Sequence, residues 1–474
     1  MTGELGLLRR HGQSERTDRL RKDDASTALP AAVAKSLERD LKAEIDGEVR
    51  FDRGTRALYA TDGSNYRQAP IGVVVPRHVQ DVEAAVRLCR QYRAPILSRG
   101  GGTSLAGQCC NVAVVLDFSK YLHSVVEIDA ERRLGRVQPG CVLDRFREAA
   151  REQAGLFFGP DPATHSRCTI GGMLGNNSCG SQSLLSKKHG MGVRMSDNTH
   201  TLDIILYDGT RLEVGPTPPD KLEALIRAGG RIGGIYQSLQ SLVQRHGAAI
   251  RGHFPRLERR VSGYNLDDLL PENGFNVARA LVGSESTLVT IVEAVLHLVP
   301  APKARSVAML GFKDLPAAAE CGLEVIKFEP TACEGIDELL FGYVKQKGDE
   351  NAALAILPQG PAFLLVEFGG ESKEDSDGQA RRMMDHVKGL GGRAPVDMKL
   401  YDDPQQEKMI WDVREGGLGS TAWVPGQPDT WPGWEDSAVP VAATPQYLRE
   451  LRALFDRYDY HPSLYGHIGQ GCIH

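Results

Sequence analysis

The chain has few of the features that mark a metal cluster, a disulfide framework or a membrane span. Its nine cysteines form no C-x-x-C pair, and that absence excludes a local iron–sulfur ligand run within this chain. An odd number of cysteines without framework spacing indicates reduced thiols, so we expect a cytoplasmic protein. No apolar run approaches the roughly 18 residues of a membrane-spanning helix, which leaves only peripheral membrane association open.

The charge balance and the N-terminal segment exclude further classes. A net charge of −5 gives no electrostatic reason to expect nucleic acid as a partner. Residues 1–26 mix acidic and basic side chains without an apolar core segment, so they match neither a secretory signal nor an organelle transit peptide. Together with a helix predicted near 29–45, they are assigned to a flexible and helical extension over residues 1–48.

Hydrophobic periodicity divides the rest of the chain into two regions. Between 49 and 300, short apolar runs such as 71–76 alternate with helical spacing, as at 78–93, which predicts an α+β domain. Asp208 and Gly209 lie between two apolar runs and predict a hairpin turn. From 301 to 474, predicted strands and helices alternate, which predicts an α/β substrate domain. The last strand–helix unit of this alternation is incomplete at residue 474, so we expect that the chain is truncated.

The first glycine-rich stretch, SRGGGTSLAGQ (98–108), follows a predicted strand. Consecutive backbone N–H groups in such a turn can form a concave site for an anion, and the hydroxyls of Thr103 and Ser104 add donors. The stretch is not a phosphate-binding Walker loop, because no Gly-Lys-Ser/Thr follows, and it lacks the Rossmann G-x-G-x-x-G spacing. On spacing alone, a structural turn and a pyrophosphate loop are equally good interpretations.

The second stretch, GPDPATHSRCTIGGMLGNNSCGS (159–181), is a long irregular segment. Loops of this length are usually functional, and the alternative of a plain surface loop fits the apolar part CTIGGML poorly. The two stretches together resemble the flavin loops of the flavoprotein family typified by vanillyl-alcohol oxidase and p-cresol methylhydroxylase. VGSESTLVTIVEAVL (282–296) resembles a third block of that family, with Ser286 in place of its second glycine.

The resemblance implies a p-cresol-methylhydroxylase-type (PCMH-type) FAD-binding domain of two α+β subdomains at 49–300. A ferredoxin-like α/β substrate domain, itself incomplete, would follow at 301–474. It also implies noncovalent FAD. A covalent flavin link at His165 is the alternative to a plain loop histidine, which we favour. The residues implied in cofactor binding are Arg99, Gly100, Gly101, Gly102, Thr103, Ser104, Pro160, Asp161, Thr169, Gly172, Asn177, Gly180 and Glu285.

The second half resembles the branch of FAD-dependent D-2-hydroxyacid dehydrogenases. Arg414, in MIWDVREGGLGS, stands where that branch binds the substrate carboxylate, although a helix arginine beside Glu415 also reads as a surface ion pair. WEDSAVP (434–440) resembles the K-x-D-x-S-x-P strand of the branch. Trp434 replaces its lysine, which predicts a different way of binding the substrate.

The final stretch, GHIGQGCIH, resembles the motif G-H-x-G-D-G-N-x-H of the same branch, with Gln470 and Cys472 as departures. The resemblance implies that His467 and His474 ligate a divalent metal, commonly zinc, and that His467 and Arg414 are catalytic. Taken alone, two histidines among glycines indicate a polar turn. A catalytic zinc typically takes three protein ligands, so the third ligand, and an iron–sulfur domain if one exists, would lie beyond residue 474.

The resulting hypothesis is an FAD-dependent oxidoreductase that converts a D-2-hydroxyacid, of the lactate, glycolate or 2-hydroxyglutarate class, to the 2-oxoacid. Its electrons would go to a carrier other than NAD, such as a quinone, an electron-transfer protein or an iron–sulfur domain. Two alternatives stay open. One is a flavin transferase like alkyl-glycerone-phosphate synthase, and the other is an FAD-binding fragment that is catalytically incomplete.

Overall fold

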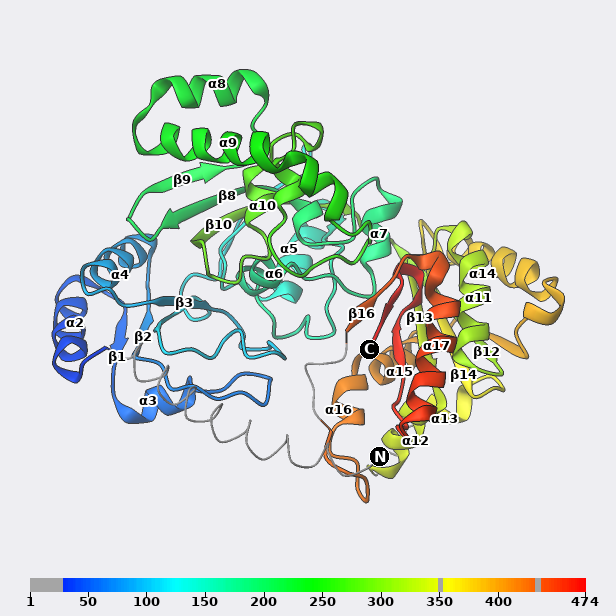
Figure 1. Ribbon diagram of the computed structural model, residues 1–474. Helices are drawn as coiled ribbons and strands as arrows, with labels where there is room; N and C mark the ends of the chain where they lie inside the picture. Colours follow the sequence, from blue (N-terminus) through cyan, green and yellow to red (C-terminus); the bar gives the residue numbers. More distant parts are fainter. Residues whose placement is uncertain (1–28, 348–352, 431–435) are drawn as a thin grey trace, which may run out of the picture.

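The computed structural model describes residues 29–347, 353–430 and 436–474. It shows two mixed helix-and-strand domains side by side (Figure 1), with the C-terminal end of the chain on the side of the second domain that faces the first. Trp434 and residues 1–28 of the expected extension lie outside the described residues. No helix in the described ranges is long and apolar enough to cross a membrane.

The first subdomain is built on a four-stranded sheet in the order β1-β2-β4-β3, in which β2, β4 and β3 are parallel. Its elements are α2 (Ala31–Glu44), β1 (Glu48–Arg50), α3 (Arg53–Leu58), β2 (Gly72–Val75), α4 (Val79–Gln91), β3 (Ile96–Arg99) and β4 (Val114–Asp117). Leu37 and Leu41 of α2 are fully buried in one core with Val74 and Val82. The described part of the expected extension is therefore integral to this subdomain, because its apolar face packs on the sheet and on α4.

The second subdomain is a five-stranded antiparallel sheet in the order β5-β6-β10-β8-β9. Its strands are β5 (Val125–Asp129), β6 (Leu134–Val137), β8 (Thr199–Leu206), β9 (Arg211–Val214) and β10 (Val289–His297). Its helices are α5 (Leu143–Ala154), α6 (Ile170–Asn176), α7 (Ser183–Lys188), α8 (Pro219–Ala228), α9 (Gly230–His253) and α10 (Val277–Leu281). The strands β7 (Leu156–Phe157) and β11 (Val299–Pro300) form a separate pair.

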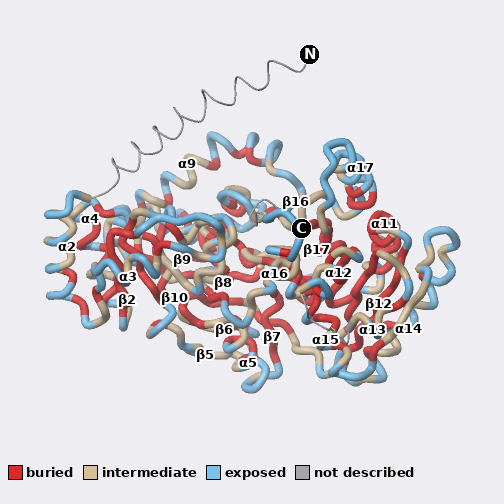
Figure 2. Tube along the Cα trace, turned by 90° about the horizontal axis from the view of Figure 1, so that it is seen from below, coloured by how far each residue is buried: buried red, intermediate tan, exposed pale blue. Residues whose placement is uncertain are grey.

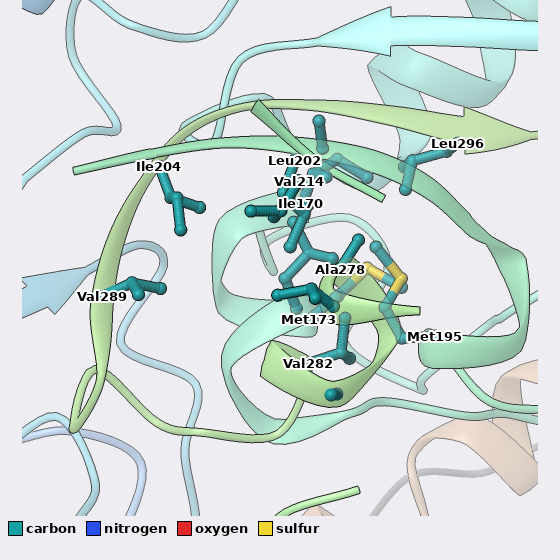
Figure 3. Packing of buried hydrophobic residues seen from close by; sticks show 14 of the residues in the cluster. Ile170, Met173, Met195, Leu202, Ile204, Val214, Ala278, Val282, Val289 and Leu296 are labelled. Atoms are coloured by element: carbon teal, nitrogen blue, oxygen red, sulfur yellow. The ribbon is translucent and has the colours of Figure 1, made fainter. Parts of the chain in front are cut away.

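Packing of α6 on this sheet fixes the second glycine-rich stretch. Ile170 and Met173 of α6 lie among Leu202, Val214 and Leu296 of the strands (Figure 3). The hairpin predicted at Asp208 and Gly209 is present between β8 and β9, and Gly209 has the positive φ of 87° that such a turn requires.

The second domain is a seven-stranded antiparallel sheet in the order β15-β12-β14-β13-β17-β18-β16. Its strands are β12 (Ala304–Phe312), β13 (Ala332–Asp337), β14 (Ala362–Gly370), β15 (Asp397–Tyr401), β16 (Ser437–Ala438), β17 (Tyr465–His467) and β18 (Cys472–Ile473). Its helices are α11 (Leu315–Val325), α12 (Glu338–Gln346), α13 (Ala353–Ile356), α14 (Lys373–Lys388), α15 (Pro404–Glu415), α16 (Gly417–Thr421) and α17 (Thr444–Arg457).

The ferredoxin-like unit that was expected to be incomplete has its four strands, β12 to β15, and both of its crossover helices, α11 and α14. Helices cover both faces of the sheet. Ala308 and Leu310 of β12 face the cluster with α11 and α14, whereas Val307 and Met309 face the cluster with α12 and α15. Because successive side chains of a strand point to opposite faces, β12 is apolar and buried on both faces from Val307 to Phe312. Figure 2 shows these central strands as buried and the outer side of α14 as exposed.

The terminal motif is part of this sheet. β17 pairs with β13 and with β18, so that GHIGQGCIH forms a tight hairpin within the fold. His467 and Gln470 are buried. The motif is therefore a buried hairpin and not the polar surface turn that its glycines indicate on their own.

Candidate flavin and substrate site

A cavity of about 500 Å³ lies between the two domains, a size typical of a site for a cofactor or small molecule. The first domain contributes parts of the segments 97–109, 162–181, 259–262 and 284–291. The second domain contributes Arg414, Glu415, Leu418, Asp436, Tyr465, His467 and His474. One continuous space therefore connects the glycine-rich loops with the terminal hairpin.

Most of the cofactor-binding residues predicted from the sequence line this cavity. They are Arg99, Gly100, Gly101, Gly102, Thr103, Ser104, Thr169, Gly172, Asn177, Gly180 and Glu285. Pro160 and Asp161 do not appear among the described lining residues, and Pro162, Ala163 and Thr164 reach the cavity instead.

The first glycine-rich loop packs directly on the second. A Cβ atom on Gly100 would lie 1.9 Å from Thr169 Oγ1, and one on Gly101 would lie 2.3 Å from the carbonyl oxygen of Arg167. Gly102 has a φ of 65°, which favours glycine. The glycines therefore allow two backbone segments to meet without side chains between them, which leaves the N–H groups of the loop free to face a ligand.

Arg99 braces this loop from behind. Its guanidinium donates to the carbonyl oxygens of Cys109 (2.9 Å) and Thr61 (2.8 Å) and lies over the ring of Tyr59. The hydrogen bond to Cys109 joins the start of the loop, at Arg99, to its end. We therefore assign Arg99 a positioning role, in addition to any contact with a phosphate.

The second loop presents a buried donor. Thr169 caps α6 by accepting from the N–H of Gly172 (3.3 Å), and Asn177 ends the helix in the left-handed conformation. Asn177 Oδ1 accepts from the N–H of Ser196 (2.9 Å), but Asn177 Nδ2 is buried without a partner among the described residues. A buried amide N–H₂ without an acceptor is costly, so a bound ligand with acceptor atoms, as FAD has, fits this wall of the cavity.

Asp161 has a different place from the one expected. It is buried and forms an ion pair with Arg147 of α5, whose Nε donates to the carbonyl oxygen of Phe158 (2.9 Å). A Cβ atom on Gly180 would lie 1.6 Å from the carbonyl oxygen of Asp161. Asp161 therefore anchors the start of the loop to the helix behind it.

On the second domain, Glu334 of β13 joins the two residues predicted to be catalytic. Arg414 Nη2 donates to Glu334 Oε2 (2.6 Å), and His467 Nδ1 lies 2.9 Å from the same oxygen. All three side chains are buried. Burial raises the pKa of Glu334, but His467 and Arg414 outweigh it and lower that pKa to about 2.

His467 is held as a neutral imidazole. Burial, followed by the nearby charge of Arg259, lowers the pKa of His467 to about 3. With Glu334 accepting at Nδ1, the proton of the neutral ring belongs on Nδ1, and Nε2 keeps its lone pair. The ring lines the cavity, so that this lone pair is available to a proton or a metal ion there.

His474 lies beside His467, with ring centroids 5.0 Å apart, and its Nδ1 pairs with Asp436. Each histidine therefore has a carboxylate at Nδ1, the arrangement that usually orients metal-binding imidazoles. The described residues bring no third histidine, cysteine or carboxylate donor into a cluster with these two. The pair supplies two donors where a catalytic zinc typically takes three.

His165 links the two domains. Its Nδ1 bonds to Asp144 of α5 (2.8 Å) and its Nε2 to Glu415 at the end of α15 (3.3 Å). The bond to Glu415 raises the pKa of His165 to about 9 against the smaller opposing effect of burial. Both ring nitrogens are thus engaged by carboxylates.

Sequence reasoning missed one cavity residue, Arg259, and also Glu334, which bonds to two residues of the cavity wall. Glu334 lies in a strand that periodicity did not predict, and Arg259 comes from the segment between α9 and α10, where it donates to Gln470 Oε1 (2.8 Å). The only available signal was a charged residue in an apolar run, ACEGID.

Known families match both halves of the chain. Residues 70–215 match the FAD binding domain family, and residues 301–474 match the C-terminal domain of FAD linked oxidases. The chain therefore carries an FAD-binding domain, of the PCMH type, and after it the C-terminal domain of FAD linked oxidases.

Curated relatives of this chain include proteins that are 24–28% identical. A D-2-hydroxyglutarate dehydrogenase of Pseudomonas putida is 28% identical over 95% of this chain and 45% of its own length. A glycolate oxidase subunit of Bacillus subtilis is 26% identical over 93% of this chain and 80% of its own length. The chain thus spans about half the length of the D-2-hydroxyglutarate dehydrogenases that it matches.

Solved structures share the fold. p-Cresol methylhydroxylase has a TM-score of 0.63 at 13% identity, with 94% of this chain and 82% of that chain covered. An alkyldihydroxyacetonephosphate synthase has a TM-score of 0.60 at 18% identity, with 93% and 79% covered. At these identities the likeness concerns the fold alone.

Proposed function

We propose that this protein oxidises a D-2-hydroxyacid to the corresponding 2-oxoacid and passes the electrons to a carrier other than NAD. The observation that carries the proposal is the continuity of one cavity from the glycine-rich loops to the Glu334, Arg414 and His467 cluster. The names of the relatives, D-2-hydroxyglutarate dehydrogenase and glycolate oxidase, support the substrate class.

FAD, when bound, supplies the acceptor for the hydride on Cα of the hydroxyacid. The loops at 98–108 and 159–181 would hold it, with the N–H groups of Gly100 to Gly102 at the pyrophosphate and Asn177 Nδ2 along the cofactor. Glu285 lies at the rim of the cavity near Gln108 and would face the nucleotide end. The remaining chemistry belongs to the second domain.

His467 would accept the proton of the α-hydroxyl group at Nε2. A neutral imidazole can take up that proton, and Glu334 beside Nδ1 stabilises the imidazolium that results. Removing the hydroxyl proton leaves electron density on oxygen that helps to expel the hydride from Cα. Glu334 thus acts as a positioning residue, since it bonds to His467 and has no contact with substrate in this proposal.

Arg414 would bind the C1 carboxylate of the hydroxyacid. One edge of its guanidinium is occupied by Glu334, while its Nε is buried without a partner among the described residues. A carboxylate is the group that best satisfies a guanidinium. Binding C1 at Arg414 would place Cα and its hydroxyl group close to His467, because both residues are held by the same carboxylate.

The experiment is dye-linked turnover with D-2-hydroxyglutarate, D-lactate and glycolate, using the whole natural protein with bound FAD. The proposal expects reduction of the dye with at least one of the three and none with the L-enantiomers. A protein that carries FAD and reduces the dye with none of them would refute it. Release of a fatty acid from an acyl-glycerone phosphate would favour the transferase alternative, which at present has fold likeness alone.

A divalent metal, most simply zinc, is a separate part of the proposal. His467 and His474 would supply two of its ligands at Nε2, with Glu334 and Asp436 orienting the rings. With such an ion present, Nε2 of His467 would not be free for the hydroxyl proton, and the ion would instead lower the pKa of the α-hydroxyl group. Elemental analysis of the purified protein tests it: the wild type should contain close to one metal ion per chain, and His474→Ala should lose it. Metal-free protein at full activity would remove this part and leave the proton-acceptor role of His467 intact.

A further inference from the structure

Arg259 brings a second guanidinium group to the cavity, and it comes from the first domain. It lies between α9 and α10, is half-buried, and lines the cavity. Its Nη1 donates to Gln470 Oε1 (2.8 Å) of the terminal hairpin and lies 3.5 Å from the carbonyl oxygen of Gly180. Arg259 therefore sits where the second flavin loop meets the terminal hairpin.

The positive charge of Arg259 is not neutralised by an ion pair in the described part of the chain. The neighbouring Arg260 pairs with Asp267, and Arg414 pairs with Glu334. Arg259 instead donates to two neutral oxygens, those of Gly180 and Gln470. A cation removed from water without a counter-charge is costly. A residue in this state at a cavity wall is suited to bind an anionic ligand.

Arg259 also shares a wall with the centre of the proposed reaction. Arg259, Arg414 and His467 line the same cavity. Arg414 forms an ion pair with Glu334. Arg259 feels the charges of Glu334 and Asp436, but among the described residues no carboxylate bonds to it. A ligand with a single carboxylate at Arg414 would leave Arg259 without a bonded carboxylate, whereas a dianion would supply one to each arginine.

We propose that Arg259 binds a second, distal carboxylate of the substrate, so that the preferred substrate class is a 2-hydroxy dicarboxylic acid. The inference rests on the proposed function for its placement of C1 at Arg414. Guanidinium groups bind carboxylates through paired, charge-assisted hydrogen bonds. Gln470 supports this role, because a neutral acceptor holds the side chain in place without consuming its charge.

The test compares Arg259→Met and Arg259→Lys with wild type on D-2-hydroxyglutarate and on D-lactate and glycolate. A lost charge-assisted hydrogen bond is worth roughly 1.5–3 kcal/mol, or about 10- to 150-fold. We expect Arg259→Met to raise KM for the dicarboxylate by about that factor and to change KM for the monocarboxylates less than about threefold. Arg259→Lys should show a smaller rise. Arg256→Met, which removes an exposed arginine of the same segment, should behave as wild type.

Gln470→Glu is an isosteric variant that adds a carboxylate beside Arg259. It should weaken binding of the dicarboxylate in the same direction as Arg259→Met, since the new charge competes with the ligand. Flavin content and melting temperature report whether each variant folds. An unchanged KM for the dicarboxylate in Arg259→Met, or an equal rise for glycolate, would overturn the assignment.

Equilibrium binding separates this inference from the proposed function. The dicarboxylate 2-oxoglutarate and the monocarboxylate pyruvate can be titrated against the flavin absorbance of the FAD-loaded protein without turnover. Preferential binding of 2-oxoglutarate that is lost in Arg259→Met supports the role of Arg259 even if no hydroxyacid is oxidised. No preference in the wild type, in a protein that does oxidise hydroxyacids, overturns the inference and leaves the proposed function standing.

Discussion

Replacing Glu334 with glutamine should disable the site while keeping its shape. Glu334 is the only described carboxylate that bonds to both Arg414 and His467. The substitution removes one negative charge and no volume. It leaves the buried Arg414 cation without a counter-charge, and it replaces the acceptor that fixes the proton of His467 on Nδ1.

The expected magnitudes follow from these two losses. Breaking a buried ion pair by removing one partner lowers the free energy of unfolding by roughly 3–5 kcal/mol. Because the glutamine side chain keeps one acceptor oxygen, we expect the lower value, about 3 kcal/mol. For a domain of this size that corresponds to a fall in melting temperature of roughly 6–12 °C. Loss of the orienting carboxylate should lower kcat/KM by about 10- to 100-fold beyond any loss of folded protein.

Glu367→Gln provides the matched control. Glu367 is also a buried carboxylate, on the neighbouring strand β14, where it accepts from Trp411 Nε1 (3.0 Å) and Thr331 Oγ1 (3.0 Å). Neither of these two partners lines the cavity, whereas both partners of Glu334 do. This control should lose stability but retain kcat/KM per FAD-loaded chain. Equal activity of the two variants would refute the role given to Glu334, whatever their melting temperatures.

Three further outcomes are expected. Gly101→Ala should reduce FAD affinity in a fluorescence titration, because its Cβ would lie 2.3 Å from the carbonyl oxygen of Arg167. Overpacking costs roughly 1–3 kcal/mol, which corresponds to a loss of about 5- to 150-fold. His165→Gln removes the bond to Glu415. The pKa of His165 is raised from its ordinary value of 6.5 to about 9 in the folded protein, so the protonated ring stabilises the fold by on the order of 1–2 kcal/mol after screening. This contribution is fully present below about pH 6.5 and is lost as the pH rises through 9. Melting temperatures of wild type and variant should therefore converge above pH 9, and a constant gap would contradict this. Phe146→Ala, in the core of the second subdomain, should cost about 3–5 kcal/mol in denaturant unfolding.

The sequence was informative wherever local pattern decides structure. The loop structure of the two glycine-rich stretches could be predicted, because glycine tolerates close approach of backbone segments and positive φ. The hairpin at Asp208 and Gly209 could be predicted because this residue pair favours the required turn. β13 was missed because Glu334 and Asp337 interrupt its apolar pattern, although the strand is buried along its whole length. Its charged residues are compensated by partners far along the chain, and such partners leave no local signal.

The site was predicted in its parts but not in its connections. His467, Arg414 and the loop residues could be named from motifs, since motifs preserve spacing along the chain. The bonds from Glu334 to His467 and from Arg259 to Gln470 join residues 133 and 211 positions apart. They depend on the pairing of β13 with β17 and on the packing of the two domains, which one sequence does not encode in readable form.

The most direct test of the account is anaerobic mixing of the FAD-loaded protein with D-2-hydroxyglutarate, protiated or deuterated at Cα, while the visible flavin absorbance is followed. The account predicts that the absorbance bleaches and that deuteration slows the bleaching, since the bond from Cα to hydrogen breaks in that step. It also predicts that Glu334→Gln bleaches more slowly than Glu367→Gln. A flavin that stays oxidised with this substrate, with D-lactate and with glycolate would contradict the central claim.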